Sequence, residues 1–176
     1  MVRLSSIVVV FLLCVVSSYA TNDVDVQAIC KKATDPSFCS TLLNSMPGGP
    51  GKDLSCLASY TIDVLRTNVS NTINVIEKLI AESGNDPRKQ NKYKNCLSSL
   101  GMDDGALGDV DEAKQLLKDL DYNGVNMRIS SLMSNVNDCS SEDSLPFDDT
   151  STLSKQVGVV NQVAQIILII SNVLLI

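Results

Sequence analysis

The side chains that could carry chemistry in this sequence are cysteines and carboxylates, because the chain contains no histidine. A Ser-His-Asp triad, a Cys-His pair and a histidine metal site are therefore impossible, and the usual general base near neutral pH is missing. Adjacent aspartates occur at Asp103-Asp104 and Asp148-Asp149, but both pairs fall in predicted loops. A hydrolase that uses opposed carboxylates is thus disfavoured, and we expect a protein that is not an enzyme.

Metal binding is the other chemistry that acidic residues could provide. Asp103, Asp104, Asp109 and Asp111 resemble a calcium loop in composition. They lack the alternating ligands, the glycine at position six and the glutamate at position twelve that an EF-hand needs. The cysteines also lack the CxxC spacing of zinc sites. We expect a solvated acidic turn, with no metal and no cofactor.

Composition limits the class of protein. The chain has 176 residues, of which 44% are hydrophobic and 19% charged, with a net charge of −6. This length allows one domain, and the apolar content is too high for a disordered protein. Nucleic-acid binding needs a clustered excess of Lys and Arg, so the acidic balance argues against it.

The first twenty residues have the pattern of a secretory signal peptide. Arg3 provides a positive start, residues 7–16 are apolar, and small residues at Ser18 and Ala20 fit a signal peptidase. The apolar run is short for a membrane anchor, so we predict cleavage after Ala20 and secretion. Loss of residues 1–20 removes Arg3 and leaves thirteen basic and twenty acidic side chains, a formal charge of −7.

Residues 21–51 are predicted to form a helical hairpin. A short amphipathic helix ends near Asp35-Pro36, and a second helix covers residues 37–44. Cys30 and Cys39 lie on either side of Pro36, so a disulfide between them would staple the hairpin. Breaker residues 46–51 follow and separate the hairpin from the main body.

Residues 52–176 are predicted to form an up-down-up-down four-helix bundle, so the fold class is all-α. Four segments joined by short connections, at 53–83, 87–120, 122–139 and from about 152 onward, carry apolar residues at helical spacing. Asp53 and Ser151 are the expected caps of the first and last helices. The stripe of the second segment comprises Tyr93, Cys96, Leu97 and Leu100, followed by Ala106, Val110, Ala113, Leu117 and Leu120.

The last segment has three possible roles, because residues 156–176 carry no charged side chain. A transmembrane span and a cleaved GPI signal both fit such a tail. Polar residues interrupt it, however, and its apolar residues still follow a helical stripe. The other three segments also need a fourth wall, so we predict a buried helix of the bundle.

A secreted chain meets an oxidising compartment, and five cysteines remain after signal cleavage. Antiparallel neighbouring helices make Cys96–Cys139 the second expected disulfide. Counted from the turn near Asp121, the two cysteines are out of step by about 10 Å. A break in the helix at residues 101–105 would absorb this excess. Cys56 is left as the odd thiol, which we expect to be buried as a small apolar residue.

Asn68 begins a glycosylation sequon, Asn68-Val69-Ser70. A glycan and a chance tripeptide within a helix are both open at this point.

The pattern resembles the plant invertase/pectin methylesterase inhibitor family across essentially the whole mature chain. The resemblance rests on five short motifs in a fixed order along the chain. They are Ile29-Cys30-(x)8-Cys39-(x)2-Leu42-Leu43, Tyr93-(x)2-Cys96-Leu97, Asp121-Tyr122-(x)2-Val125, Cys139 followed by an acidic stretch, and Val159-Val160-Asn161-Gln162-Val163-Ala164. It implies a four-helix bundle with an N-terminal hairpin. Leu100 stands where the family usually has an aromatic residue.

The resemblance implies a secreted protein inhibitor of a plant cell-wall enzyme that docks non-covalently, one to one, over the active-site cleft. Members inhibit either pectin methylesterase or acid invertase. Invertase inhibitors of the family often carry Pro-Lys-Phe where this chain has Leu120-Asp121-Tyr122, which favours pectin methylesterase. The expected location is the apoplast or cell wall, with the vacuole as an alternative, and the expected state is a monomer or weak dimer.

The outer face of the second and third bundle helices is the expected contact surface. The candidate residues lie outside or near the edge of the apolar stripes and are Asp109, Glu112, Lys118, Asp121, Tyr122 and Asn126. The competing interpretation for each of them is a solvated helix face. A competing function is a non-inhibitory secreted module, either an allergen-like bundle or a small-ligand carrier, and a carrier would need a cavity.

Overall fold

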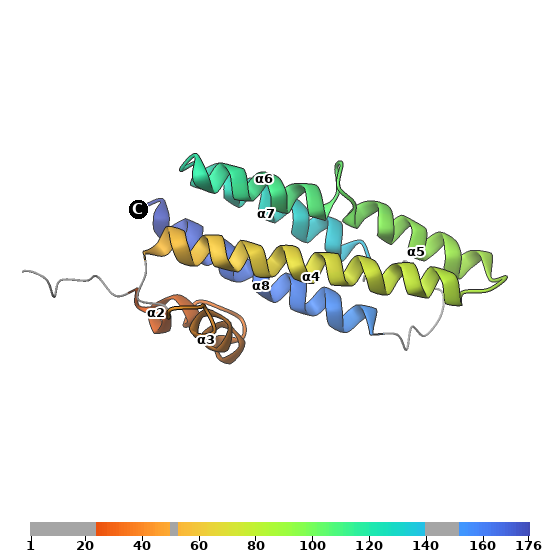
Figure 1. Ribbon diagram of the computed structural model, residues 1–176, viewed down its shortest axis with the longest axis horizontal. Coiled ribbons are helices and arrows are strands. Elements are labelled where there is room, and N and C mark those ends of the chain that lie inside the picture. Colours follow the sequence, from red (N-terminus) through yellow and green to blue (C-terminus); the bar gives the residue numbers. More distant parts are fainter. Residues whose placement is uncertain (1–23, 50–52, 140–151) are drawn as a thin grey trace, which may run out of the picture.

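A computed structural model describes residues 24–49, 53–139 and 152–176 as seven helices, with no strand among them (Figure 1). The predicted signal peptide, the acidic segment 140–149 and Ser151 lie outside the described residues. α4 (Leu54–Glu82), α7 (Tyr122–Asn137) and α8 (Leu153–Leu174) are three walls of the predicted bundle. α5 (Pro87–Leu100) and α6 (Ala106–Lys118) together make the fourth. The prediction of an all-α four-helix bundle is confirmed.

The N-terminal hairpin consists of α2 (Val26–Cys30) and α3 (Pro36–Asn44). It packs against α4 and α8, on the side of the bundle away from α6 and α7 (Figure 1). The side-chain amide of Gln165 on α8 joins it to the bundle by accepting from the Thr34 N–H at 3.0 Å and donating to the Thr34 hydroxyl at 2.7 Å. The hydroxyls of Ser45 and Tyr60, 2.9 Å apart, form a second link.

Aspartate side chains begin five of the helices. Each accepts a hydrogen bond from a backbone N–H in the first turn and so satisfies a donor that has no partner within the helix. The capping residues are Asp25, Asp35, Asp53, Asp86 and Asp121. The hydrogen bond from the Cys56 N–H lowers the pKa of Asp53, because it favours the ionised carboxylate.

The core follows the apolar stripes of the four walls. Along α4, Leu57, Leu65, Val69 and Ile76 are fully buried, and Thr61 satisfies its hydroxyl on the Leu57 carbonyl. α8 is long and apolar enough to cross a membrane by length and composition. In the structure it packs against α4 and α7 with nine of its residues buried, in agreement with the predicted bundle helix.

Both predicted disulfides are present. Cys30 and Cys39 join α2 to α3 with their Cα atoms 5.4 Å apart, and Cys96 and Cys139 join α5 to the end of α7 at 4.9 Å. The expectation that Cys56 is buried is wrong, because its side chain is exposed and donates to the Asp53 carboxylate at 3.6 Å. Its helical phase explains this, since Leu57 and Ala58 face the core from the same turn.

The predicted break in the second wall is confirmed at residues 101–105. The carbonyl of Gly101 accepts hydrogen bonds from the N–H groups of Leu107 at 3.2 Å and Gly108 at 3.4 Å, which caps the start of α6 in place of a side chain. The loop backbone also lies directly against Gly108, where a Cβ atom would overlap the Met102 carbonyl oxygen. The break therefore requires a residue without a side chain at position 108.

We predict that Gly108→Ala lowers the free energy of unfolding by about 1–3 kcal/mol, because the methyl group must displace backbone. Gly158→Ala is the matched control, since a Cβ atom there meets nothing within 4 Å. Alanine at that helical position should stabilise the protein by about 0.5–1 kcal/mol. Urea denaturation measures both changes, and a Gly108→Ala protein as stable as the parent would contradict this account of the break.

Candidate functional site

The predicted contact residues lie on α6, on α7 and in the turn between them. α6 and α7 pack against each other as an antiparallel pair along one edge of the bundle (Figure 1). Glu112 and Lys118 are exposed on α6, and Asp121 is exposed in the turn. Tyr122 is half-buried and packs against the core. The structure therefore places these four residues on α6, at the start of α7 and in the turn between them.

Asp109 does not belong to the exposed surface, which corrects the prediction. Its side chain is only 5% exposed. One carboxylate oxygen accepts from the Asn135 amide at 3.1 Å, and the other lies 3.5 Å from the Arg128 guanidinium. Asp109 is one residue before the buried Val110, so its helical phase turns it toward α7. Its charge suggested solvent, but paired and hydrogen-bonded carboxylates can lie inside a protein.

Glu112 continues this polar contact between the two helices. Its carboxylate accepts from the Arg128 guanidinium at 2.8 Å, so Arg128 on α7 bridges Glu112 and Asp109 on α6. The Asn135 amide also lies 3.3 Å from the Asp104 carbonyl, which ties the break at 101–105 to α7. The charged side chains of this edge thus hold the two helices in register.

Asn126 is also engaged within the bundle. Its amide donates to the Asn172 side chain at 2.8 Å, and its oxygen accepts from the Ser171 hydroxyl. These bonds join α7 to the end of α8. Asn126 is half-buried, so it positions α7 and offers little polar surface of its own.

The turn between α6 and α7 contains a feature that the sequence analysis missed. Leu120 was assigned to the apolar stripe of the second wall, but its side chain is 65% exposed. Its backbone has a φ of 60°, in the left-handed region that usually favours glycine. The N–H of Leu120 donates to the Leu117 carbonyl at 3.2 Å, and the N–H of Asp121 donates to the Leu116 carbonyl at 2.9 Å. These bonds form a Schellman motif with leucine at the glycine position.

Met127 is a second exposed apolar side chain of the helix pair, on α7, at 73% exposure. The sequence did carry a signal for it, because Met127 falls between Val125 and Ile129, which form the buried stripe of α7. We call the surface formed by Glu112, Lys118, Leu120, Asp121 and Met127 the α6–α7 face. It combines two exposed apolar side chains with charged neighbours.

A charged seam supports this face from behind, between α4 and α6. The Arg66 guanidinium contacts both carboxylate oxygens of Asp111, at 2.7 and 3.2 Å, and Lys114 pairs with Asp63. The hydrogen bond that Arg66 donates to the Asp111 carboxylate raises the pKa of Arg66. Asp111 is therefore an ion-pair partner, and no cluster of three or more potential metal-binding side chains occurs in the described residues.

Asn68 lies within α4, where its amide donates to the Val64 carbonyl at 2.8 Å. The nitrogen that would carry a glycan is thus half-buried in a helical hydrogen bond. Glycosylation of Asn68 stays a prediction from the sequon.

Comparison with known proteins decides the family. The family model for plant invertase/pectin methylesterase inhibitors matches residues 24–175. This chain belongs to that family. Pectinesterase inhibitor 1 of Arabidopsis thaliana is 30% identical over 93% of this chain and 90% of its own, and a pectinesterase inhibitor of Actinidia deliciosa is 28% identical over 85% and 78%. These relatives are named as inhibitors, which agrees with the prediction that the chain is not an enzyme.

Solved structures of the family share the fold. A mutant form of a pectin methylesterase inhibitor from Arabidopsis superposes with a TM-score of 0.72 at 26% identity, over 84% of this chain and 95% of that chain. A second pectin methylesterase inhibitor from Arabidopsis thaliana gives a TM-score of 0.64 at 26% identity. The hairpin and the bundle are therefore the architecture of pectin methylesterase inhibitors.

We predict that Leu120→Gly raises the free energy of unfolding by about 1 kcal/mol, because glycine adopts the left-handed conformation without a Cβ penalty. Leu120→Ala is the control, since alanine removes the same exposed side chain but keeps the strained backbone. Urea denaturation of the parent and both variants measures the difference. A glycine variant no more stable than the alanine variant would show that the turn is unstrained.

Proposed function

We propose that this protein inhibits a plant pectin methylesterase by docking non-covalently, one to one, over the enzyme's active-site cleft. The observation that carries the proposal is the match to pectinesterase inhibitor 1 of Arabidopsis thaliana, which extends over 90% of that protein's length. Docking requires no chemistry from the inhibitor, in keeping with a chain that has no histidine. The inhibitor acts by excluding the pectin substrate from the groove.

The α6–α7 face is the proposed contact surface. Leu120 and Met127 offer exposed apolar side chains of the kind that fill pockets at the centre of an interface. Strained backbone conformations persist where the surrounding structure fixes them, and they concentrate at functional sites. Leu120 fits this description, because a leucine holds a glycine conformation while its side chain points to solvent.

Rigidity is the second argument for this face. The Glu112–Arg128 ion pair, the Asn126–Asn172 hydrogen bond and the Asp121 cap fix the two helices and their turn before any partner binds. A surface that is already ordered loses less conformational entropy on association. Lys118 and Glu112 at its rim would set orientation rather than supply most of the affinity.

Secretion fits this function. We propose that residues 1–20 are a signal peptide removed after Ala20 and that the protein acts in the cell wall or apoplast, with the vacuole as the alternative. The mature charge of −7 would steer the inhibitor toward a basic enzyme, with an association rate that falls as salt concentration rises.

The test is an inhibition assay with the secreted, oxidised protein against a plant pectin methylesterase and, separately, a plant acid invertase. We expect residual activity to fall for pectin methylesterase alone, because Leu120-Asp121-Tyr122 replaces the Pro-Lys-Phe typical of invertase inhibitors. Inhibition of invertase alone would reassign the target, and full activity of both enzymes would refute the inhibitory function.

The same assay tests the contact surface. Leu120→Ala and Met127→Ala should each weaken inhibition by about ten-fold, as expected for central interface residues. Met102→Ala is the matched control, because Met102 is also exposed, at 55%, but lies at the opposite end of α6. Equal inhibition by all three variants would exclude the α6–α7 face.

A further inference from the structure

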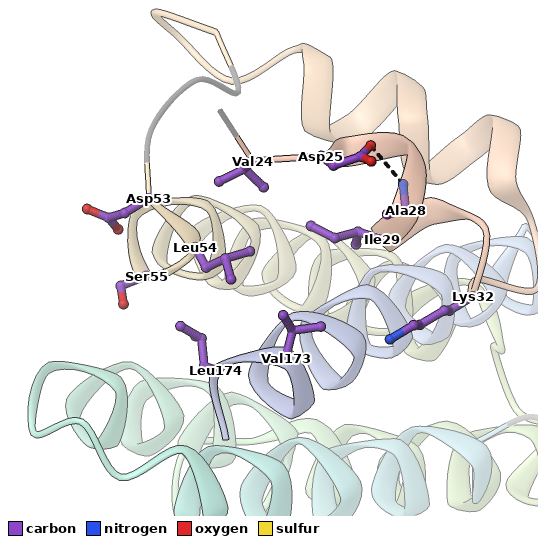
Figure 2. Close-up of a pocket in the computed structure, with 10 residues that line it drawn as sticks. All are labelled: Val24, Asp25, Ala28, Ile29, Lys32, Asp53, Leu54, Ser55, Val173 and Leu174. Atoms are coloured by element: carbon purple, nitrogen blue, oxygen red, sulfur yellow. Dashed lines mark hydrogen bonds between the residues drawn. The ribbon is translucent and has the colours of Figure 1, made fainter. Parts of the chain in front are cut away.

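A pocket of about 610 Å³ lies between the hairpin and the bundle (Figure 2). α2 forms one wall, and the first turn of α4 and the last turn of α8 form the others. Most of its lining is apolar, from Val24, Ala28, Ile29, Leu54, Val173 and Leu174. This volume is within the range of pockets that hold small organic molecules.

The apolar lining is incompletely covered by the protein itself. Val24, Leu54, Val173 and Leu174 are only half-buried, although Val24, Leu54 and Leu174 pack against the core. A hydrophobic body placed between the hairpin and the bundle would remove this surface from water, which is favourable in proportion to the area buried. The pocket therefore suits an apolar molecule.

Charge is distributed unevenly around the pocket. The Asp25 carboxylate is engaged in capping α2, where it accepts from the Ala28 N–H at 3.0 Å. The Asp53 carboxylate is engaged in capping α4, where it accepts from the Cys56 N–H at 2.8 Å. Lys32 lies at the end of the pocket away from Asp53, and its amine extends toward α8 (Figure 2). Within the described residues this ammonium group has no ion-pair partner.

We propose that this pocket binds a small monocarboxylate with an elongated apolar body, its carboxylate paired with Lys32 and its apolar part directed toward Leu54 and Leu174. The aspartate at the opposite end repels an anionic group, so the two ends define the orientation. A ligand site here is separate from the proposed inhibitory function, because the hairpin and the α6–α7 face lie on different sides of α4 and α8 (Figure 1).

The probe is dodecanoate below its micellar concentration, titrated calorimetrically into the secreted, oxidised protein, with methyl dodecanoate as the neutral match. We expect the acid to bind and the ester to bind about three-fold more weakly, the effect of one exposed ion pair. Lys32→Gln should weaken dodecanoate binding by about three-fold. Lys31→Gln is the matched control, because Lys31 is an exposed neighbour that does not line the pocket. The Lys31→Gln protein should bind dodecanoate with the affinity of the parent.

Two filling variants test the location. Ala28→Phe and Val173→Phe project a ring into the pocket from opposite walls, and each should weaken binding by about ten-fold or more while thermal unfolding stays cooperative. The site would be overturned if either folded variant bound dodecanoate as tightly as the parent. It would also be overturned if the parent did not bind dodecanoate. Equal effects of Lys31→Gln and Lys32→Gln would overturn the role of Lys32. Inhibition of pectin methylesterase should survive in all four variants, so the two proposals fail independently.

Discussion

The Cys96–Cys139 disulfide constrains the arrangement of the whole bundle, because it joins helices whose lengths do not match. Cys96 lies farther from the α6–α7 turn in sequence than Cys139 does, and an unbroken helix cannot bring the two sulfurs together. The break at residues 101–105 absorbs the difference, and the Gly101 carbonyl restarts the helix as α6. The disulfide and the break together fix the position of α6 along α7.

Polar contacts then fix the α6–α7 pair at the level of side chains. Arg128 bridges Asp109 and Glu112, and Asn126 binds the end of α8. The Asp121 carboxylate in the turn is engaged as well, because it accepts from the Gly124 N–H at the start of α7. Leu120 and Met127 are the exposed apolar side chains of this pair, which is why the proposed interaction rests mainly on shape and apolar burial.

Sequence reasoning predicted the architecture well because strong local signals agreed with each other. Apolar spacing, aspartate caps and the Pro and Gly breakers set the helices, and the mismatch between Cys96 and Cys139 located the break at 101–105. Cys56 was misplaced because it was assigned by residue type, and Asp109 because a charged side chain near the edge of the stripe was expected to face solvent. Leu120 was misplaced because the helical spacing was extended beyond Lys118, where α6 ends.

The pocket beside the hairpin could not be predicted at all. It arises from the space between α2 and the ends of α4 and α8, and a single sequence carries no information about that spacing. The left-handed backbone conformation of Leu120 could not be predicted either, because leucine is among the residues least expected in this conformation. In both cases tertiary placement, and not local propensity, determines the feature.

Hydrogen–deuterium exchange of the inhibitor, alone and in complex with pectin methylesterase, tests the central claim most directly. The claim is that the cross-linked bundle presents a rigid α6–α7 face to the enzyme. We predict slow exchange of α6 and α7 amides in the isolated protein and further protection of residues 118–127 in the complex. Fast exchange of α6 and α7 in the isolated protein, or protection confined to the hairpin or to α5, would contradict it.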